Sequence, residues 1–268
     1  MTTPSFDSTL VASRVYLGKK PARPNAVKFL LRDYIDMDAI DPPPVFGHIV
    51  NRDDMMLGML GNDQCGDCVV AGSMHEIMIW TRAAAHYTAP FTADLAKHQY
   101  MLASGWNGVN NDPSDTGLDM QQFAARRRGL GVTDANGNVH RIKAYARIRS
   151  WDTLVKATYV FGAAALGIRV PASALSQFDA QQPWSPVAAS PMEGGHYVCV
   201  VGRNSRGNLV CVTWGRLQAM TRDFVEHYAD EIIAYIPGPD YLDSQTRLTP
   251  EKFDEAKLDD DLAHLARA

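Results

Sequence analysis

Long apolar runs and an excess of basic residues are both missing from this chain of 268 residues. No stretch of eighteen apolar residues is present, so the sequence offers no candidate for a membrane-spanning helix. Lysine and arginine number 26 against 30 aspartates and glutamates, which gives a net charge of -4. We therefore expect neither nucleic acid nor a membrane as a partner, because both usually select basic proteins. The one basic cluster, 126–128, is expected on a solvated helix face.

Cysteine is also scarce, with four residues in the whole chain. The first residues, MTTPSFD, lack the basic start and apolar centre of a secretory signal peptide, so we expect a cytoplasmic or virion-associated protein without a signal peptide. Thiols in such a protein stay reduced, and a disulfide framework is not expected. With 46% apolar residues, the chain can bury a full core as one domain or as two closely packed lobes.

One of the four cysteines lies at the start of a predicted helix. Residues 62–72 read NDQCGDCVVAG, and from Cys68 to about Tyr87 the chain has no proline and repeats apolar residues at helical spacing. Unpaired N–H groups and the positive end of the helix dipole favour a thiolate over a thiol at this position. We therefore predict a lowered pKa for Cys68 and take it as the candidate nucleophile.

A histidine at the mouth of a predicted strand is the candidate proton carrier. His196 opens the valine-rich run 196–202, and a second β-like run, 209–214, follows the turn sequence RNSRGN, which predicts a hairpin. An imidazolium facing Cys68 would stabilise the thiolate, and His196 would then protonate the leaving group. We expect the sulfur and an imidazole nitrogen to lie within or near hydrogen-bond reach.

In order and spacing, these two segments resemble the active-site segments of the papain-like cysteine peptidases. The family's cysteine segment, Gln-x-x-Cys-Gly-x-Cys-aromatic-Ala, is similar to residues 62–71, and its histidine segment is similar to residues 195–202. The resemblance covers roughly residues 44–237 and includes a helix of bacterial members at GLDMQQFAARRRG. It implies that Cys68 is the nucleophile, that His196 is its partner, and that Asn62 replaces the glutamine that helps to form the oxyanion hole.

The family's third catalytic residue has no counterpart in this sequence. That residue is the asparagine of Asn-Ser-Trp-Gly, and the chain has VTWG at residues 212–215. Because the side chain of Val212 cannot hydrogen-bond an imidazole, Thr213 or a backbone carbonyl is left to orient His196. In the family Cys65 matches a cysteine that forms a disulfide, but apart from the candidate nucleophile Cys68 no cysteine follows here until Cys199, more than 130 positions away. We expect no such bridge.

By composition the chain divides into three parts. Residues 1–44 form an N-terminal arm with a basic stretch, KKPARP at 19–24, and three successive prolines that favour an extended linker. In the family such an arm can block the cleft as a propeptide, while an arm that wraps its own domain or a neighbour fits equally well. Residues 45–244 form the papain-like domain, and residues 245–268 form an acidic tail.

Within the domain, predicted helices precede predicted strands. This segregation predicts an α+β fold of two lobes, a helical lobe that carries Cys68 and an antiparallel sheet lobe that carries His196. The predicted helices span 68–87, 92–104, 119–128, 151–161 and 221–228, and the predicted strands span 163–170, 196–202, 209–214 and 231–236.

The chemistry that these residues predict is thiol-dependent hydrolysis of a peptide or protein substrate by a Cys68–His196 dyad, without a cofactor or a metal. The alternative is a catalytically idle papain-fold assembly protein of a phage particle or a bacterial complex, which holds its neighbours through the arm and the tail. The missing third residue favours this alternative, and the retained cysteine and histidine favour the enzyme.

Two other uses of the cysteines remain open on sequence alone. The CGDC segment at 65–68 fits a dithiol redox pair, although the preceding residues 55–61 are broken by glycines and do not read as a buried strand. Zinc held by all four cysteines needs Cys199 and Cys211 close to the helix start. Strand alternation predicts instead that Cys199 points away from His196 and from the helix cysteines.

Overall fold

The computed structural model describes residues 15–24, 26–49, 54–85, 87–242 and 248–251. Its centre is a seven-stranded sheet in the order β4-β9-β5-β6-β7-β8, with β1 paired to β6, and all of its pairings are antiparallel. The strands are β1 Phe46–Gly47, β4 Ile142–Arg147, β5 Ala164–Pro171, β6 Met192–Arg203, β7 Leu209–Thr213, β8 Arg216–Met220 and β9 Ala229–Pro237. A separate pair joins β2 Val132–Thr133 to β3 Val139–His140.

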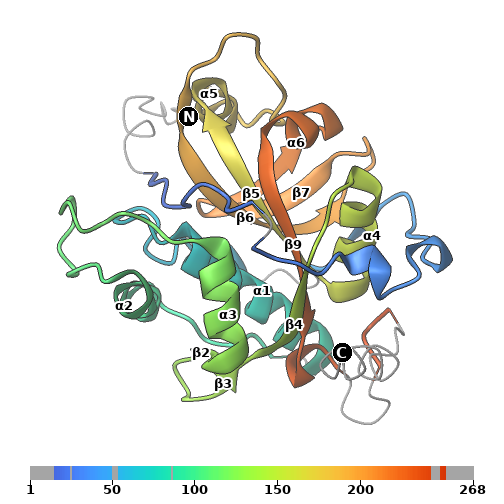
Figure 1. Ribbon diagram of the computed structural model, residues 1–268, viewed down its shortest axis with the longest axis horizontal. Coiled ribbons are helices and arrows are strands. Elements are labelled where there is room, and N and C mark those ends of the chain that lie inside the picture. The colour runs from blue at the N-terminus through green and yellow to red at the C-terminus, as the bar shows by residue number, and fades with distance from the viewer. Residues whose placement is uncertain (1–14, 25, 50–53, 86, 243–247, 252–268) are drawn as a thin grey trace, which may run out of the picture.

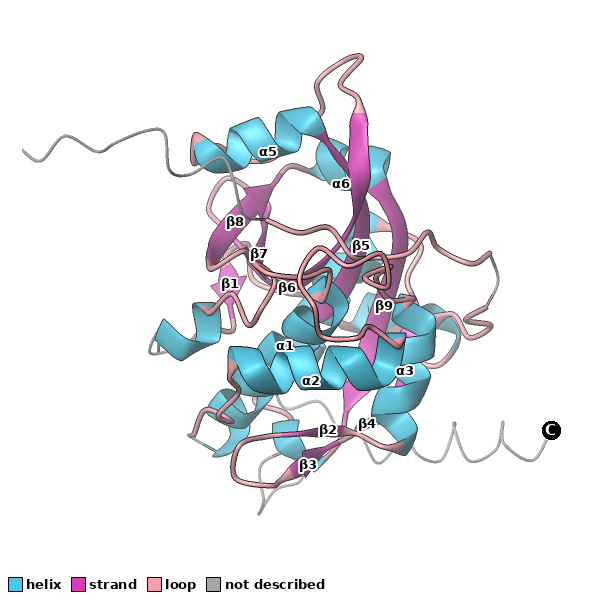
Figure 2. Ribbon diagram, turned by 90° about the vertical axis from the view of Figure 1, so that its left-hand side faces the viewer, coloured by secondary structure: helices cyan, strands magenta, loops and turns pink. Residues whose placement is uncertain are grey.

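Helices cover both faces of this sheet (Figure 1, Figure 2). One buried cluster joins the sheet to three helices, and a second cluster joins the opposite face to three others. The first three are α1 Cys68–Ala85, α2 Ala93–Ser104 and α3 Met120–Gly129, and the others are α4 Trp151–Phe161, α5 Ala172–Asp179 and α6 Arg222–Tyr228. The predicted α+β architecture is confirmed.

Side-chain caps explain why several helices begin where the sequence predicts. Thr92, Asp119, Ser150 and Thr221 each accept a hydrogen bond from a backbone N–H in the first turn of the following helix. Three elements, β4, β8 and α5, were not predicted from the sequence. The first two are short strands of mixed polarity, and α5 follows directly on the last residue of β5, so apolar periodicity marks none of them.

The two faces of β6 contact different helices. Tyr197 and Cys199 lie in the core around α1, whereas Val198 and Val200 lie in the core around α4. A Cβ at Gly72 of α1 would overlap the Tyr197 ring, so the absent side chain permits this close approach. Strand alternation places Cys199 on the face opposite to His196, as predicted, but the prediction that it also points away from the helix cysteines is wrong, because Cys199 shares a buried cluster with Cys65 and Cys68.

The basic cluster on α3 is also not simply a solvated face. Arg127 is buried, forms an ion pair with the buried Glu76 of α1, and lies over the ring of Tyr235. Tyr197 donates a hydrogen bond from its hydroxyl to the same carboxylate. A buried charge requires such partners, so Arg127 holds α3 to α1 and to the sheet. No helix in the described part of the chain is long and apolar enough to cross a membrane.

The described part of the N-terminal arm lies against the domain along its length. Residues 15–24 run between α3 and the sheet, and Leu31 and Met37 then enter the core around α4 (Figure 1). Of the acidic tail, Glu251 accepts a hydrogen bond from Tyr241, and the rest of that predicted segment lies mostly outside the described residues. The domain boundaries at residues 44 and 244 stay predictions.

Candidate functional site

Cys68 is the first residue of α1, as the sequence predicts, and only 1% of it is exposed. Burial raises the pKa of its thiol to about 12, which outweighs the lowering by backbone hydrogen bonds with Tyr197 and Gly18. Tyr197 directly follows His196, so the thiol lies beside the strand that carries the histidine. The predicted lowering of the Cys68 pKa is wrong for this covered state, because desolvation exceeds the effect of the helix terminus.

His196 lies on β6 between a hydroxyl and an aromatic face. Its Nε2 is 2.7 Å from Oγ1 of Thr213 at the end of β7, and its ring stacks on Trp214 with centroids 4.2 Å apart. Trp214 and Gly215 both have positive φ, of 42° and 79°, and they form the two-residue turn from β7 to β8. Positive φ at both positions is typical of a type I′ hairpin turn. This turn places the indole over the imidazole.

Thr213 therefore occupies the position that the absent asparagine leaves open. Of the two groups that the sequence leaves to orient His196, Thr213 and a backbone carbonyl, the structure shows Thr213 in contact with Nε2. Val212, which takes the asparagine's place in the sequence, is buried in the core around α1. Since neighbouring strand residues point to opposite faces, Val212 and Thr213 do not share the same surroundings.

No ion pair joins Cys68 to His196 in the described structure. Burial lowers the pKa of His196 to about 3, so both groups are neutral at pH 7. His196 Nδ1 has no hydrogen-bond partner among the described residues. In the tautomer whose Nε2 donates to the Thr213 hydroxyl, Nδ1 carries the lone pair and can accept a proton. The catalytic pairing of the two residues stays a prediction.

Asn62 lies in the loop before α1, and its buried side-chain amide binds peptide carbonyls. Nδ2 donates to the carbonyl of Tyr16 and to that of Cys65, both at 3.2 Å, and the Tyr16 N–H returns a bond to the Asn62 carbonyl at 3.1 Å. An amide donor that already holds a carbonyl of the arm has the chemistry that an oxyanion hole requires. Its assignment to an oxyanion hole rests on the sequence resemblance and stays a prediction.

The arm crosses the candidate site at residues 17–20. Lys19 donates its N–H to the carbonyl of Gly195 at 3.0 Å, Lys20 donates to Leu118 at 2.8 Å, and Leu118 donates to Gly18 at 2.7 Å. The arm is therefore hydrogen-bonded to the strand residue before His196 and to the loop before α3. A Cβ at Gly18 would overlap the backbone of Gly66, two residues before Cys68. Only glycine fits where the arm passes this loop.

The remaining cysteines are free and buried. Cys65 donates from its sulfur to the Gly61 carbonyl at 3.7 Å, and burial raises the pKa of its thiol. The same direction holds for Cys199 and Cys211. A redox dithiol depends on a low-pKa, accessible thiol, and the covered structure gives neither Cys65 nor Cys68 that character.

Comparison with known proteins identifies the fold. No protein-family model and no curated protein matches the sequence. Among solved structures, xylellain, a cysteine protease from Xylella fastidiosa, matches with a TM-score of 0.62 and 15% identity over 84% of this chain and 97% of that chain. A procathepsin B from Trypanosoma congolense gives 0.58 and 12% over 83% and 87%, and a digestive procathepsin L 3 from Tenebrio molitor larval midgut gives 0.56 and 11% over 84% and 77%.

The chain therefore has the papain-like α+β fold, and the sequence resemblance is confirmed at the level of the fold. At these identities the likeness extends to the backbone arrangement alone. The chemistry has to be argued from the side chains of this chain.

Proposed function

We propose that this protein is a thiol-dependent hydrolase of peptide or related amide bonds, with Cys68 as the nucleophile and His196 as the proton carrier. The observation that carries the proposal is the Thr213 hydroxyl on His196 Nε2, which restores the orienting contact that the sequence lacks. In the tautomer whose Nε2 donates to Thr213, the Nδ1 lone pair is left for the thiol proton.

In the proposed reaction Cys68 gives its proton to His196 Nδ1, and the sulfur attacks the carbonyl carbon of the substrate. The oxyanion that forms receives hydrogen bonds from the Cys68 N–H and the Asn62 amide, and each such donor contributes about 10²–10³ in rate. His196 then gives the proton to the leaving amine, and water releases the acyl group from Cys68. Trp214 shields the imidazole from bulk water by stacking on it.

If the protein is this hydrolase, the chain described here is its inactive, latent form, because the arm covers the candidate site. Residues 17–20 occupy the path beside Gly66, Gly195 and Leu118, and the donors of Asn62 already bind Tyr16 and Cys65. Two of the matched structures are described as procathepsins, which supports an inhibitory arm. Of the roles that the sequence leaves open for the arm, we favour self-inhibition.

A matched pair of glycine substitutions tests the proposal in the full chain. Gly18→Ala puts a methyl group into the Gly66 backbone and expels the arm from the cleft, whereas Gly129→Ala puts one into open space. We expect the first variant alone to gain labelling of Cys68 by a thiol-directed electrophile and to hydrolyse members of a broad peptide library. Rapid labelling of Cys68 without hydrolysis of any peptide would contradict the proposed hydrolase activity.

A catalytically idle assembly protein is the second candidate, and one observation favours it. Cys68 and His196 are both neutral, and His196 Nδ1 has no partner among the described residues. In this case Cys68→Ala leaves complex formation intact, whereas removal of the arm or the tail disrupts it. Measuring assembly and peptide cleavage on the same variants separates the two candidates.

A further inference from the structure

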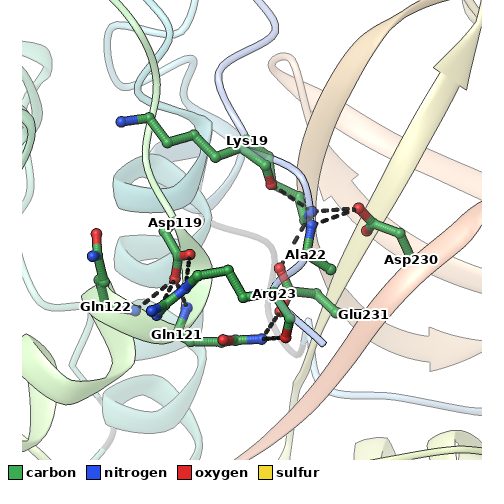
Figure 3. A network of polar contacts seen from close by, with 9 residues as sticks. Lys19, Ala22, Arg23, Asp119, Gln121, Gln122, Asp230 and Glu231 are labelled. Carbon is green, nitrogen blue, oxygen red and sulfur yellow. Dashed lines mark hydrogen bonds and ion pairs between the residues drawn. The ribbon is translucent and has the colours of Figure 1, made fainter. Parts of the chain in front are cut away.

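The side chain of Lys19 is fully buried although it belongs to the arm. Its side-chain exposure is 0%, and its ammonium lies 2.8 Å from Asp230, 3.3 Å from Glu231 and 2.9 Å from the carbonyl of Lys20. Three acceptors therefore surround a group with three donors. Figure 3 shows the two carboxylates of β9 facing the arm.

The pocket that holds this side chain is built by the domain. A Cβ at Gly167 of β5 would overlap Lys19 Cε and would lie 2.8 Å from Met120 Sδ at the start of α3. Gly167 thus leaves room for the aliphatic stem, and Met120 lines it. The carboxylates at the end of the pocket come from Asp230 and Glu231, and Gln121 Nε2 donates to Glu231 at 2.8 Å, which fixes that carboxylate.

The pocket opens directly beside the candidate catalytic residues. Lys19 bonds through its N–H to Gly195, the neighbour of His196, while Gly18 bonds through its backbone to the Cys68 thiol. A peptide that takes the place of the arm therefore presents a side chain to this pocket from a position next to the bond that is cut. The arm occupies the pocket with the Lys19 side chain and the position beside Cys68 with the Gly18 backbone.

The charge of the pocket decides which side chain it takes. With the arm removed, Asp230 and Glu231 lose the ammonium that bridges them, and Asp230 Oδ1 already lacks a partner among the described residues. Burial raises the pKa of Glu231, whereas the Lys19 charge lowers it. An apolar side chain would cover two carboxylates without pairing either, which is costly, whereas a cation pairs both.

We propose that Gly167, Met120, Asp230 and Glu231 form a specificity pocket for a basic side chain, and that the substrates are peptides with lysine or arginine beside the scissile bond. The inference rests on the proposed function for its use in catalysis, and it extends that function to a substrate class. Lys19 is the arm's own occupant of the pocket.

The test uses the full chain with Gly18→Ala and Lys19→Ala, so that the arm neither seals the cleft nor fills the pocket. Its ligands are the peptide Tyr-Leu-Gly-Lys-Lys, taken from residues 16–20, and the same peptide with norleucine at the first lysine. We expect the lysine peptide to bind about 100-fold more tightly by calorimetry, because a site built for a polar group rejects the analogue that lacks it. Equal affinities would overturn the proposal.

Two variants made in the Gly18→Ala, Lys19→Ala background test whether the pocket causes the preference for the lysine peptide. Asp230→Asn with Glu231→Gln removes both charges, and Gly167→Ala fills the stem channel, so each is expected to reduce the preference for lysine at least tenfold. A preference that survives both changes would overturn the proposal. The Gly167 variant leaves the carboxylates in place, so it covers the case in which the charge-neutral variant does not fold.

Hydrolysis is read separately on library peptides with lysine, arginine or norleucine at one position. Faster cleavage of the basic peptides supports both the pocket and the enzyme. Selective binding without cleavage of any peptide leaves the pocket intact and contradicts the proposed function, and cleavage without selectivity contradicts the pocket alone.

Discussion

Gly18 and Lys19 are neighbours in the arm, yet they enter opposite environments. Gly18 lies at a neutral end of the cleft, where burial raises the pKa of Cys68 and lowers that of His196. Lys19 enters a charged end, where two carboxylates face one ammonium. In the proposed latent form, covering the thiol and anchoring the arm are therefore done by different residues. The backbone at Gly18 covers the thiol, and the side chain of Lys19 supplies the charged contacts that hold the arm.

Removal of the Cys68 sulfur is the most severe test of the neutral end of the cleft. In the arm-displaced Gly18→Ala background, Cys68→Ala is expected to lower kcat/KM on a cleaved peptide by at least about 10⁴-fold, because the covalent step is lost. Steady-state hydrolysis measures the loss, and Cys65→Ala is the control for removal of a buried thiol that is not the nucleophile. Retained activity without Cys68 would assign the chemistry to another group.

The pH dependence of labelling compares the covered and uncovered thiol. With a pKa of about 12 in the covered state, Cys68 has about 10³-fold less thiolate at pH 7 than an ordinary cysteine with a pKa near 9. Because the covered thiol stays mostly protonated from pH 7 to 10, its thiolate fraction rises about tenfold per pH unit over this range. The labelling rate of the intact chain is expected to rise in the same proportion. In Gly18→Ala we expect the rate to level off below pH 9. A plateau near neutrality in the intact chain would contradict this comparison.

The charged end is tested by comparing two cations of the same arm. Lys19→Met leaves two carboxylates without their partner and is expected to lower the free energy of unfolding by up to about 3–5 kcal/mol, limited by detachment of the arm. Arg23 pairs with Asp119 but its side chain is 50% exposed, so Arg23→Met is expected to have a much smaller effect. Denaturant titration measures both. Equal losses would show that burial of Lys19 does not distinguish the two contacts.

The smallest expected effect concerns the orienting hydroxyl. Thr213→Val leaves His196 Nε2 without its hydrogen-bond partner, which costs about 1–3 kcal/mol and lowers kcat/KM about 10–100-fold. Thr213→Ser keeps the hydroxyl and is expected to restore activity and the pH–rate profile. Val212→Asn is not expected to substitute, because that position faces the core around α1. A rescue by Val212→Asn would mean that the strand register at His196 differs.

Local signals predicted much of the fold correctly. The predicted starts of four helices agree within one residue with the structure, where each helix follows a side-chain cap, and the valine-rich runs predicted β6 and β7. Cys68 is at its helix start as expected. These features depend on hydrogen bonds and side-chain periodicity between residues that are close in the chain, so the sequence carries them directly.

The surroundings of each candidate residue were not predicted in the same way. From the sequence, Cys199 was expected to point away from the helix cysteines, but it shares their buried cluster, and burial reversed the expected direction of the Cys68 pKa shift. Strand alternation relates one residue to the next but does not say which face the helix covers. A pKa likewise depends on everything that excludes water from the group, including residues far away in the chain.

By itself, the sequence determined a helix-start cysteine and a strand-borne histidine, because each is set by local backbone chemistry. The tertiary structure alone decided that Thr213 orients His196, that Gly18 covers Cys68 and that Lys19 lies between Asp230 and Glu231. Lys19 and Asp230 are 211 positions apart. Such a pairing follows from the closing of the sheet and the path of the arm across it, and neither segment carries a local signal of the other.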